Sequence, residues 1–399
     1  MSIKIFKSPP KYVQGPDALQ TLGDHLQAIG ISNPIIMASP SAMKACKEII
    51  ETSLKSKNMT CSFTKFSRVC SANEINRVKD LCLSGNHDAI IACGGGAAID
   101  AGRAAAAGAG YTINPFVVHE KFGANVPYIQ IPTVAASDAS TAALSVIYTD
   151  KGNWADVLII PNNPNLVLAD TRIIAQAPVR TLVAGMGDAL ATYFEADACH
   201  RTATLSFAGG LATQTALQIS RLSYDILTTY GTQAVLEAEA NIPGPALEAV
   251  VEANILLSGL GYENAGLAAA HALATAFSHQ YELFDPVPFH GELVAFCTAV
   301  QLIMEEAEPE KLQEVYFFCQ AVGLPTSFEE LGLKDTSDGT LKTVAEEAAK
   351  SLTMMAMPKA KAVADAQGFV YDVDEILNAI KLADQYSQLE TGQCHCADH

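Results

Sequence analysis

Short apolar runs and amphipathic segments alternate along the first half of the chain. The apolar runs have the length of buried strands and cover residues 12–14, 34–38, 61–66, 88–93, 128–132 and 166–169. Segments between them carry apolar residues at helical spacing, over residues 17–29, 39–53 and 71–83. Because strands that alternate with helices form parallel sheets covered on both faces, residues 1–177 are predicted to be an α/β domain. A strand pair over 143–149 and 155–160 is also expected.

The pattern changes after Pro178. Long Ala-, Leu- and Glu-rich segments with a period near 3.6 residues replace the strand-like runs. The predicted helices cover residues 186–199, 206–228, 245–262, 291–306, 311–321, 340–353 and 373–388. We therefore expect a second, all-helical domain over residues 178–399. A length of 399 residues agrees with two domains, since a single core seldom serves more than about 250–300 residues.

Composition narrows the partners that the chain can have. Its formal net charge of −18 disfavours nucleic acid and anionic membranes, because both need a cationic surface. The ten cysteines are scattered without a C-x-x-C pair, which is typical of a reducing compartment. Neither a signal peptide nor an apolar stretch of membrane-spanning length is recognised. A cytoplasmic protein without a nucleic-acid or membrane partner is predicted.

The C-terminal residues include four side chains that could bind a metal adventitiously, namely Cys394, His395, Cys396 and His399. Ordering four ligands on a loose tail costs conformational entropy, so a frayed terminus is the favoured interpretation. The tail is therefore left out of the predicted site.

A glycine-rich turn follows the strand predicted at 88–93. Three glycines, Gly94 to Gly96, precede Ala97 and Ala98 at the start of a predicted helix. Glycines allow backbone N–H groups to approach a phosphate closely, and a helix N-terminus carries a partial positive charge. The pattern differs from G-x-G-x-x-G, so a tight turn without a ligand remains an alternative to a pyrophosphate site.

A second cluster of small residues follows the strand predicted at 128–132. Residues 133–148 are rich in Ala, Ser and Thr around a single carboxylate, Asp138. Small side chains suit a surface against which a flat ring or a ribose lies. Asp138 could accept hydrogen bonds from substrate hydroxyl groups, and a helix cap or a turn aspartate is the alternative interpretation.

Two histidines in the second half stand among apolar or small residues. His271 ends the run G-L-A-A-A-H, and His290 lies in P-F-H-G-E. An unpaired polar group in an apolar site costs about 1–3 kcal/mol, so each imidazole needs a partner, for which a shared cation is suited. Asp188, in A-G-M-G-D-A, could complete a set of two imidazoles and one carboxylate that accepts Zn²⁺ or Fe²⁺. An N-cap is the alternative role for Asp188.

Eight short blocks of sequence run along most of the chain, and several of them contain the candidate residues. The blocks are K-Y-V-Q-G (11–15), G-G-G-A-A-I-D (94–100), I-P-T-V-A-A-S-D-A (131–139), A-L-S-V-I-Y-T (143–149), P-N-N-P-N (161–165), A-G-M-G-D-A-L-A-T (184–192), G-L-A-A-A-H-A (266–272) and F-H-G-E-L-V-A-F (289–296). In this order they resemble the glycerol dehydrogenase family of the metal-dependent (iron-type) alcohol dehydrogenases. The resemblance implies a Rossmann-like domain that binds NAD and a helical domain that binds a metal, which is the dehydroquinate synthase-like fold.

Roles for individual residues follow from the resemblance. Asp188, His271 and His290 would be the metal ligands and would hold the substrate through the metal, and Asp138 would be the catalytic residue that contacts glycerol. The cofactor-binding residues would be Ser39, Gly94, Gly95, Gly96, Ala97, Ala98, Thr133, Ala136, Ala142, Leu144 and Tyr148. Relatives that use iron have a further histidine one turn after the aspartate. Thr192 stands there, as in the zinc enzymes, so zinc is expected rather than iron.

The resemblance also implies a reaction. Glycerol and NAD(P)⁺ would give dihydroxyacetone and NAD(P)H, by hydride transfer from a zinc-bound alkoxide. A homo-oligomer is expected, an octamer by resemblance. Two alternative hypotheses are a non-redox NAD- and zinc-dependent cyclase of the dehydroquinate synthase type and a binding protein without catalytic activity. The first needs a cluster of Lys and Arg that the blocks lack, and the second is disfavoured because all three ligands are present.

Several positions depart from the family pattern. Ser39 stands where the family has an acidic residue that holds the adenosine ribose. A carboxylate would repel a 2′-phosphate and a serine does not, so a relaxed coenzyme choice is expected, with NADP(H) accepted beside NAD(H). Ala97 and Arg103 replace lysines of the pyrophosphate site. Residues 116–124 and the residues after His271 also differ, so the substrate could be another small diol, a hydroxyketone or an aldehyde.

Overall fold

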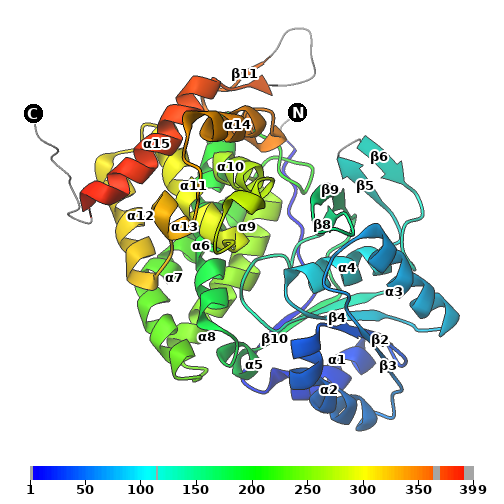
Figure 1. Cartoon of the computed structure of the whole chain (residues 1–399). Coiled ribbons are helices and arrows are strands. Elements are labelled where there is room, and N and C mark those ends of the chain that lie inside the picture. The colour runs from blue at the N-terminus through cyan, green and yellow to red at the C-terminus, as the bar shows by residue number, and fades with distance from the viewer. Residues whose placement is uncertain (1–2, 114–115, 363–368, 391–399) are drawn as a thin grey trace, which may run out of the picture. The chain divides into compact units, whose positions relative to one another are not determined.

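The computed structural model describes residues 3–113, 116–362 and 369–390, so the tail 394–399 lies outside the described residues. The chain divides into two compact units, each built from separate parts of the sequence (Figure 1). One unit comprises Lys7–Leu182 and Gln233–Leu260, and will be called the sheet unit. The other, the helical unit, comprises Met1–Phe6, Val183–Thr232 and Gly261–His399. The helices predicted after Pro178 therefore contribute to both units.

A six-stranded parallel sheet forms the centre of the sheet unit. Its strands, in spatial order, are β1 (Tyr12–Gly15), β10 (Leu166–Asp170), β7 (Tyr128–Pro132), β4 (Ile90–Gly94), β2 (Ile35–Ala38) and β3 (Ser62–Lys65). Every one of them was predicted as a strand. All six are parallel, so their carboxyl ends lie at one edge of the sheet.

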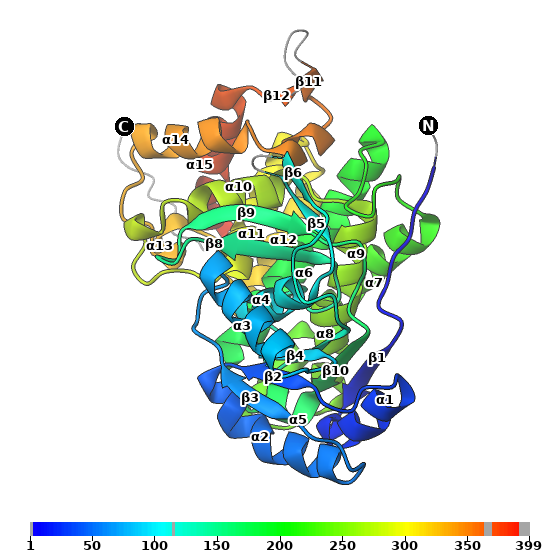
Figure 2. The same ribbon diagram turned by 90° about the vertical axis from the view of Figure 1, so that its right-hand side faces the viewer.

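Helices cover both faces of this sheet (Figure 2). Alternation within β2 shows how: Ile36 and Ala38 pack with the first set of helices, whereas Ile35 and Met37 pack with the second. The first set is η1 (Ala18–Thr21), α1 (Leu22–Ala28) and α2 (Pro40–Lys55), and the second is α3 (Ala72–Ser84) and α4 (Gly96–Ala106). The short helix α5 (Thr171–Ala175) follows β10. The α/β prediction is confirmed.

A second, antiparallel sheet belongs to the same unit. Its order is β6 (Phe116–His119), β5 (Gly110–Ile113), β9 (Trp154–Ile159) and β8 (Leu144–Tyr148). The pairing of β8 with β9 was predicted. The pairing of β5 with β6 was not, because Gly110 and the polar residues of these short strands hide the alternation.

The helix predicted at 245–262 contains an interruption. It consists of α8 (Pro245–Glu252), one π-helical turn at Ala253–Leu257, and α9 (Ser258–Ala265). A π turn inserts one extra residue into an α-helix and is frequent at functional sites. Its neighbours are described below.

Helices dominate the helical unit. They are α6 (Val179–Thr202) and α7 (Gln214–Glu239), which begin or end in the sheet unit, and α10 (Ala269–Ser278), α11 (His290–Met304), α12 (Pro309–Val322), α13 (Phe328–Leu331), α14 (Asp338–Ala348) and α15 (Val373–Glu390). Two 3₁₀ helices, η3 (Tyr281–Leu283) and η4 (Leu352–Ala356), and a two-stranded ribbon, β11 (Lys361–Ala362) with β12 (Phe369–Val370), complete the described part of this unit. Apolar residues of α10, α11, α14 and α15 form its core.

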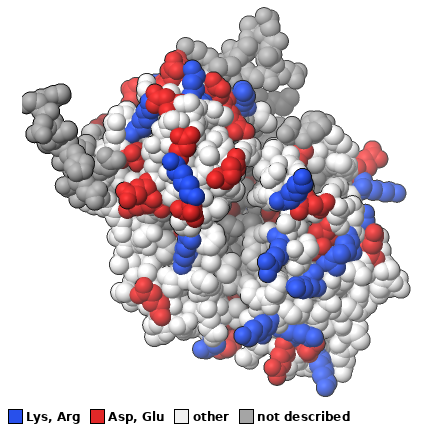
Figure 3. Space-filling view, in the orientation of Figure 1, with Lys and Arg blue, Asp and Glu red and all other residues white. Residues whose placement is uncertain are grey.

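The charged residues are mixed on the face shown in Figure 3, where Lys and Arg lie among Asp and Glu and most of the surface is uncharged. Several oppositely charged side chains form ion pairs, among them Lys359 with Glu306 and Arg201 with Asp197. Among the described residues no helix is both long and apolar enough to cross a membrane.

Candidate active site

Asp188, His271 and His290 come together in the helical unit. Asp188 lies within α6, His271 in α10, and His290 begins α11. One ligand atom from each lies within 4.8 Å of those of the others. The nearest separations are 3.3 Å from Asp188 Oδ1 to His271 Nε2 and 3.7 Å to His290 Nε2. Asp188 stands well inside its helix, so the alternative of an N-cap aspartate is wrong.

Close backbone contact between α6 and α11 brings Asp188 beside His290. A Cβ atom at Gly291 would lie 1.8 Å from the carbonyl oxygen of Ala184, and one at Gly187 would lie 2.2 Å from the carbonyl oxygen of Gly291. Only residues without a side chain permit this approach. The glycines on either side of the cluster thus explain why two helices far apart in sequence can present their side chains to one another.

Glu195 is a residue of this cluster that the sequence analysis missed. It lies two turns after Asp188 on α6 and is fully buried. Its Oε2 accepts a hydrogen bond from His271 Nδ1 at 2.6 Å. Its Oε1 accepts bonds from the backbone N–H groups of Ala268 at 2.8 Å and His271 at 3.0 Å, at the start of α10. The seven-residue spacing of two acids on an apolar helix was the available signal, because residues seven apart share a helix face.

Glu195 therefore fixes both the helix that carries His271 and the orientation of its ring. Since a carboxylate only accepts hydrogen bonds, Nδ1 must carry the proton, and Nε2 is turned toward Asp188 and His290. Burial lowers the pKa of His271, but the Glu195 and Asp188 carboxylates outweigh that effect and hold its pKa well above the ordinary value. The site is one that attracts a positive charge.

The donor set fits a divalent cation. Asp188 is 2% exposed and Glu195 is fully buried, so two carboxylates face two imidazoles in a largely dehydrated place. With both imidazoles neutral this set carries two negative charges, which a divalent cation would balance. His290 is 46% exposed, so the cluster can be reached from solvent. One carboxylate oxygen and two imidazole nitrogens suit Zn²⁺ and Fe²⁺ alike.

At the carboxyl edge of the parallel sheet, the order of the strands reverses between β2 and β4. The chain leaves β2 toward β3 on one side and leaves β4 toward β7 on the other. Ligands of open α/β sheets bind where neighbouring strands diverge in this way. Ser39 follows β2 and Gly94 ends β4, and the two are close, because Ser39 N–H donates to the carbonyl of Cys93 at 3.1 Å.

The glycine-rich turn lies at this same point. Gly94 has a φ of 156°, and a Cβ atom there would lie 3.0 Å from Ala98 Cβ and 3.2 Å from Ser39 Oγ. Gly95 precedes α4, and Gly96 and Ala97 form its first turn, so the N–H groups of this turn point toward the edge. Ser39 caps α2 by accepting a hydrogen bond from Ala42 N–H.

The remaining predicted cofactor residues follow the neighbouring strands. Thr133 succeeds β7, and its N–H donates to Gly94 O at 3.1 Å. Ala136 and the buried Ala142 lie in the connection from β7 to β8, while Leu144 and Tyr148 belong to β8. Tyr148 N–H donates to the carbonyl of Cys70, in the connection from β3 to α3. Most of the predicted residues thus follow the carboxyl ends of β2, β4 and β7, whereas Leu144 and Tyr148 lie on β8 of the second sheet.

Arg103 has a structural role within this unit. It is fully buried, pairs with Asp100 at 2.9 Å, and donates to the carbonyl oxygens of Leu144 and Ala139. Its guanidinium therefore ties α4 to the connection that carries Ala142. The sequence indicates only that Arg103 replaces a phosphate-binding lysine, and it does not predict this structural role.

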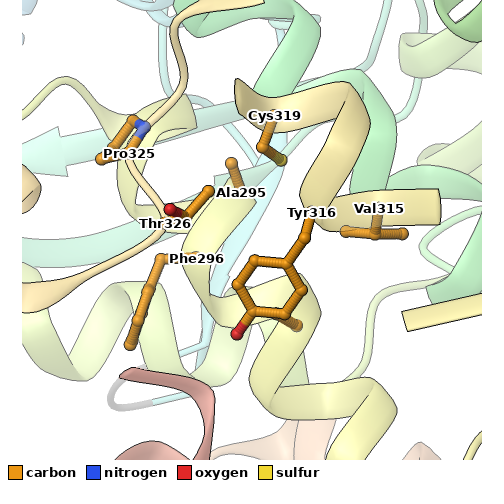
Figure 4. Close-up of a pocket in the computed structure, with 8 residues that line it drawn as sticks. Ala295, Phe296, Val315, Tyr316, Cys319, Pro325 and Thr326 are labelled. Atoms are coloured by element: carbon orange, nitrogen blue, oxygen red, sulfur yellow. The ribbon is translucent and has the colours of Figure 1, made fainter. Parts of the chain in front are cut away.

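Asp138 lies in a turn of the same connection and does not cap a helix. It is 9% exposed, and its Oδ2 accepts a hydrogen bond from Ser258 Oγ at 2.8 Å. An apolar hollow elsewhere, in the helical unit, is lined by residues of α11 and α12 with Pro325 and Thr326 (Figure 4). That hollow contains none of the predicted site residues.

The sheet unit has a parallel sheet with a glycine-rich helix start at its diverging strands. The helical unit has a cluster of carboxylates and imidazoles. Together these two features define a metal-dependent dehydrogenase of the nicotinamide-linked type. The family model for iron-containing alcohol dehydrogenases matches residues 9–171. A glycerol dehydrogenase of Citrobacter freundii is 41% identical, with 86% of this chain and 89% of that protein aligned. One of Pseudomonas putida is 38% identical over 96% of this chain and 98% of its own length.

A solved structure of Schizosaccharomyces pombe glycerol dehydrogenase has a TM-score of 0.86 and 33% identity, and covers 100% of this chain and 95% of its own. The chain belongs to the glycerol dehydrogenase family of the iron-containing alcohol dehydrogenases. The family and the fold class predicted from the sequence are confirmed.

Proposed function

We propose that this protein is a metal-dependent polyol dehydrogenase that oxidises glycerol to dihydroxyacetone with reduction of NAD(P)⁺. The observation that carries the proposal is the convergence of Asp188, His271 and His290, in a chain whose relatives are glycerol dehydrogenases. Asp188, His271 and His290 would hold a divalent cation that would supply Lewis-acid chemistry to an alcohol, and a bound nicotinamide would supply the hydride acceptor.

The side chains of the cluster have defined parts in this proposal. Asp188 would supply one oxygen ligand and the two histidines would supply nitrogen ligands. Glu195 holds the proton on His271 Nδ1, so that Nε2 keeps its lone pair for a cation. Exposure of His290 leaves the site open to a small substrate.

Zinc is the proposed metal. Thr192, one turn after Asp188 on α6 and fully buried, offers no nitrogen ligand where the iron-using relatives are expected to have a histidine. Three protein ligands leave coordination positions for the substrate, as catalytic zinc sites require. Metal analysis of protein purified without chelator separates zinc from iron.

Asp138 is proposed to contact the polyol. A buried carboxylate with one oxygen fixed by Ser258 can hold hydroxyl groups of a substrate in a set orientation. The dinucleotide is proposed to lie at the carboxyl edge of the sheet, over Gly94 to Ala98 and near Ser39, Thr133, Ala136, Ala142, Leu144 and Tyr148. Ser39 carries no charge that would repel a 2′-phosphate, which supports use of NADP⁺ beside NAD⁺.

Assembly and direction of the reaction are also part of the proposal. A homo-oligomer, an octamer by family resemblance, is proposed, and light scattering of the purified protein measures it. If NADPH is the better coenzyme, the physiological reaction is reduction of a small hydroxyketone or hydroxyaldehyde, and Ser39 is the residue that favours this second candidate.

Absorbance of the reduced nicotinamide tests the function directly. The purified, zinc-loaded protein is mixed with glycerol or 1,2-propanediol and NAD⁺ or NADP⁺, and in the reverse direction with dihydroxyacetone and NADH or NADPH. Turnover with a polyol supports the proposal. No turnover with any small diol, hydroxyketone or hydroxyaldehyde, in protein shown to contain metal, would contradict it.

A further inference from the structure

The π turn at Ala253–Leu257 directs its side of the helix onto the connection that carries Asp138. Ser258 N–H donates to Ala253 O, which is the spacing of a π turn. The segment is buried, and all of these residues belong to the sheet unit. Such a turn inserts a residue into the helix and persists when neighbouring contacts stabilise it.

Three hydrogen bonds join this segment to residues 135–141. Asn254 Nδ2 donates to Ala135 O at 2.9 Å, and also to the carbonyl of Leu182 at 3.1 Å. Thr141 Oγ1 donates to Ile255 O at 3.0 Å. The third bond runs from the Ser258 hydroxyl to the Asp138 carboxylate, which is the side chain proposed to contact the polyol.

Close approach at Gly259 makes the arrangement rigid. A Cβ atom at Gly259 would lie 1.9 Å from Thr141 Oγ1 and 2.8 Å from Asp138 O. The backbone of the Asp138 turn therefore rests directly on the helix backbone. Ser258 is next to this contact, and its Oγ lies 2.8 Å from Asp138 Oδ2.

We propose that Ser258 is a positioning residue for polyol recognition: its hydroxyl sets the rotation of the Asp138 carboxylate so that this carboxylate meets a substrate hydroxyl group. The inference rests on the proposed function, in which Asp138 contacts the polyol. Because a hydrogen bond to a charged group is stronger than one between neutral groups, loss of the Ser258 hydroxyl should change the KM of the polyol by a measurable factor. Substrates with a hydroxyl group beside the reacting carbon depend on Ser258, whereas simple alcohols do not.

The test compares Ser258→Ala with a matched control, Thr141→Val. Thr141→Val removes the hydrogen bonds from the Thr141 hydroxyl to the carbonyl oxygens of Ile255 and Asp138, and keeps the side-chain volume. For Ser258→Ala we expect the KM of glycerol to rise about tenfold or more, with the KM of NAD⁺ within about twofold and the turnover of 1-propanol unchanged. Thr141→Val should keep the glycerol KM within about twofold. Thermal unfolding of each variant shows how far the fold is affected.

A double-mutant cycle with Asp138→Asn shows whether Ser258 acts through Asp138. In the Asp138→Asn background, Ser258→Ala should raise the KM of glycerol almost no further. With Asp138 intact, Ser258→Thr, which keeps the hydroxyl, should retain most of the polyol preference that Ser258→Ala loses.

Equal effects of Ser258→Ala and Thr141→Val, or additive effects in the cycle, would overturn the positioning role. A wild-type protein that oxidises polyols while Ser258→Ala leaves their KM unchanged overturns this inference alone. A metal-loaded wild type without any polyol activity overturns the proposed function and the inference together.

Discussion

The proposed nucleotide site at the edge of the sheet and the proposed metal site differ in the groups that would bind the ligand. At the edge of the sheet, Gly94 to Ala98 present backbone N–H groups and almost no side chain. In the helical unit, Asp188, His271 and His290 present side-chain atoms from three helices that could hold a metal ion. A backbone site depends on the path of the chain, whereas a side-chain site depends on the identity of each residue. The two should therefore respond differently to substitution.

The largest effect is expected at the metal cluster. His271→Ala removes one of three ligands, so we expect kcat to fall at least about 10³-fold and the bound metal to be lost. His279→Ala is the control, because this histidine follows the same helix but pairs with Glu347. Metal content per chain and kcat measured on both variants decide the point. Retention of stoichiometric metal by His271→Ala would remove this residue from the ligand set.

A smaller loss is expected when Glu195 is neutralised. Glu195→Gln keeps an oxygen for the N–H groups of Ala268 and His271 but no longer pairs a carboxylate with the imidazole. Partners of this kind are worth about 10- to 100-fold in metal affinity, so the dissociation constant for Zn²⁺ should rise by that factor. Competition with a chromophoric chelator measures it, and Glu305→Gln, whose carboxylate pairs with Arg201, is the control. Unchanged affinity would mean that Glu195 serves only as a helix cap.

At the edge of the sheet, the backbone of Gly94 should matter more than the side chains around it. Gly94→Ala places a Cβ against Ala98 and Ser39 at a positive φ, so we expect the KM of NAD⁺ to rise about tenfold and stability to fall by about 1–3 kcal/mol. Gly15→Ala shares the positive φ but meets no atom within 4 Å, and should affect stability alone. Equal KM values for the two variants would contradict a dinucleotide at this edge.

The smallest effect is a change of coenzyme preference. Ser39→Asp places a carboxylate at the end of β2 and should raise the KM of NADP⁺ about tenfold, with the KM of NAD⁺ within about threefold. Steady-state kinetics of the variant and of the wild type, with NAD⁺ and with NADP⁺, measure these KM values. A wild-type preference for NADH of a hundredfold or more would already contradict the role given to Ser39.

Much of the fold could be predicted from local pattern. Each strand of the parallel sheet appeared as a short apolar run, because a strand buried on both faces needs apolar side chains throughout. The π turn at Ala253–Leu257 could not be predicted, since its residues follow the same helical period as their neighbours. Strands β5 and β6 could not be predicted either, because their stability comes from the pairing of β5 with β9 and with β6, which the local sequence does not show.

For the site, the sequence by itself determined which residue types were present: a glycine turn after a buried strand, two histidines in apolar surroundings, and a carboxylate that could join them. Only the tertiary structure decided that Asp188 lies beside the histidines, that Glu195 orients His271, and that Ser258 meets Asp138. Local periodicity depends on neighbouring residues and can be read along the chain. The convergence of these side chains depends on how closely the segments that carry them pack. Gly187, Gly259 and Gly291 allow this close packing, and their lack of a side chain matters only because another segment lies directly against each of them.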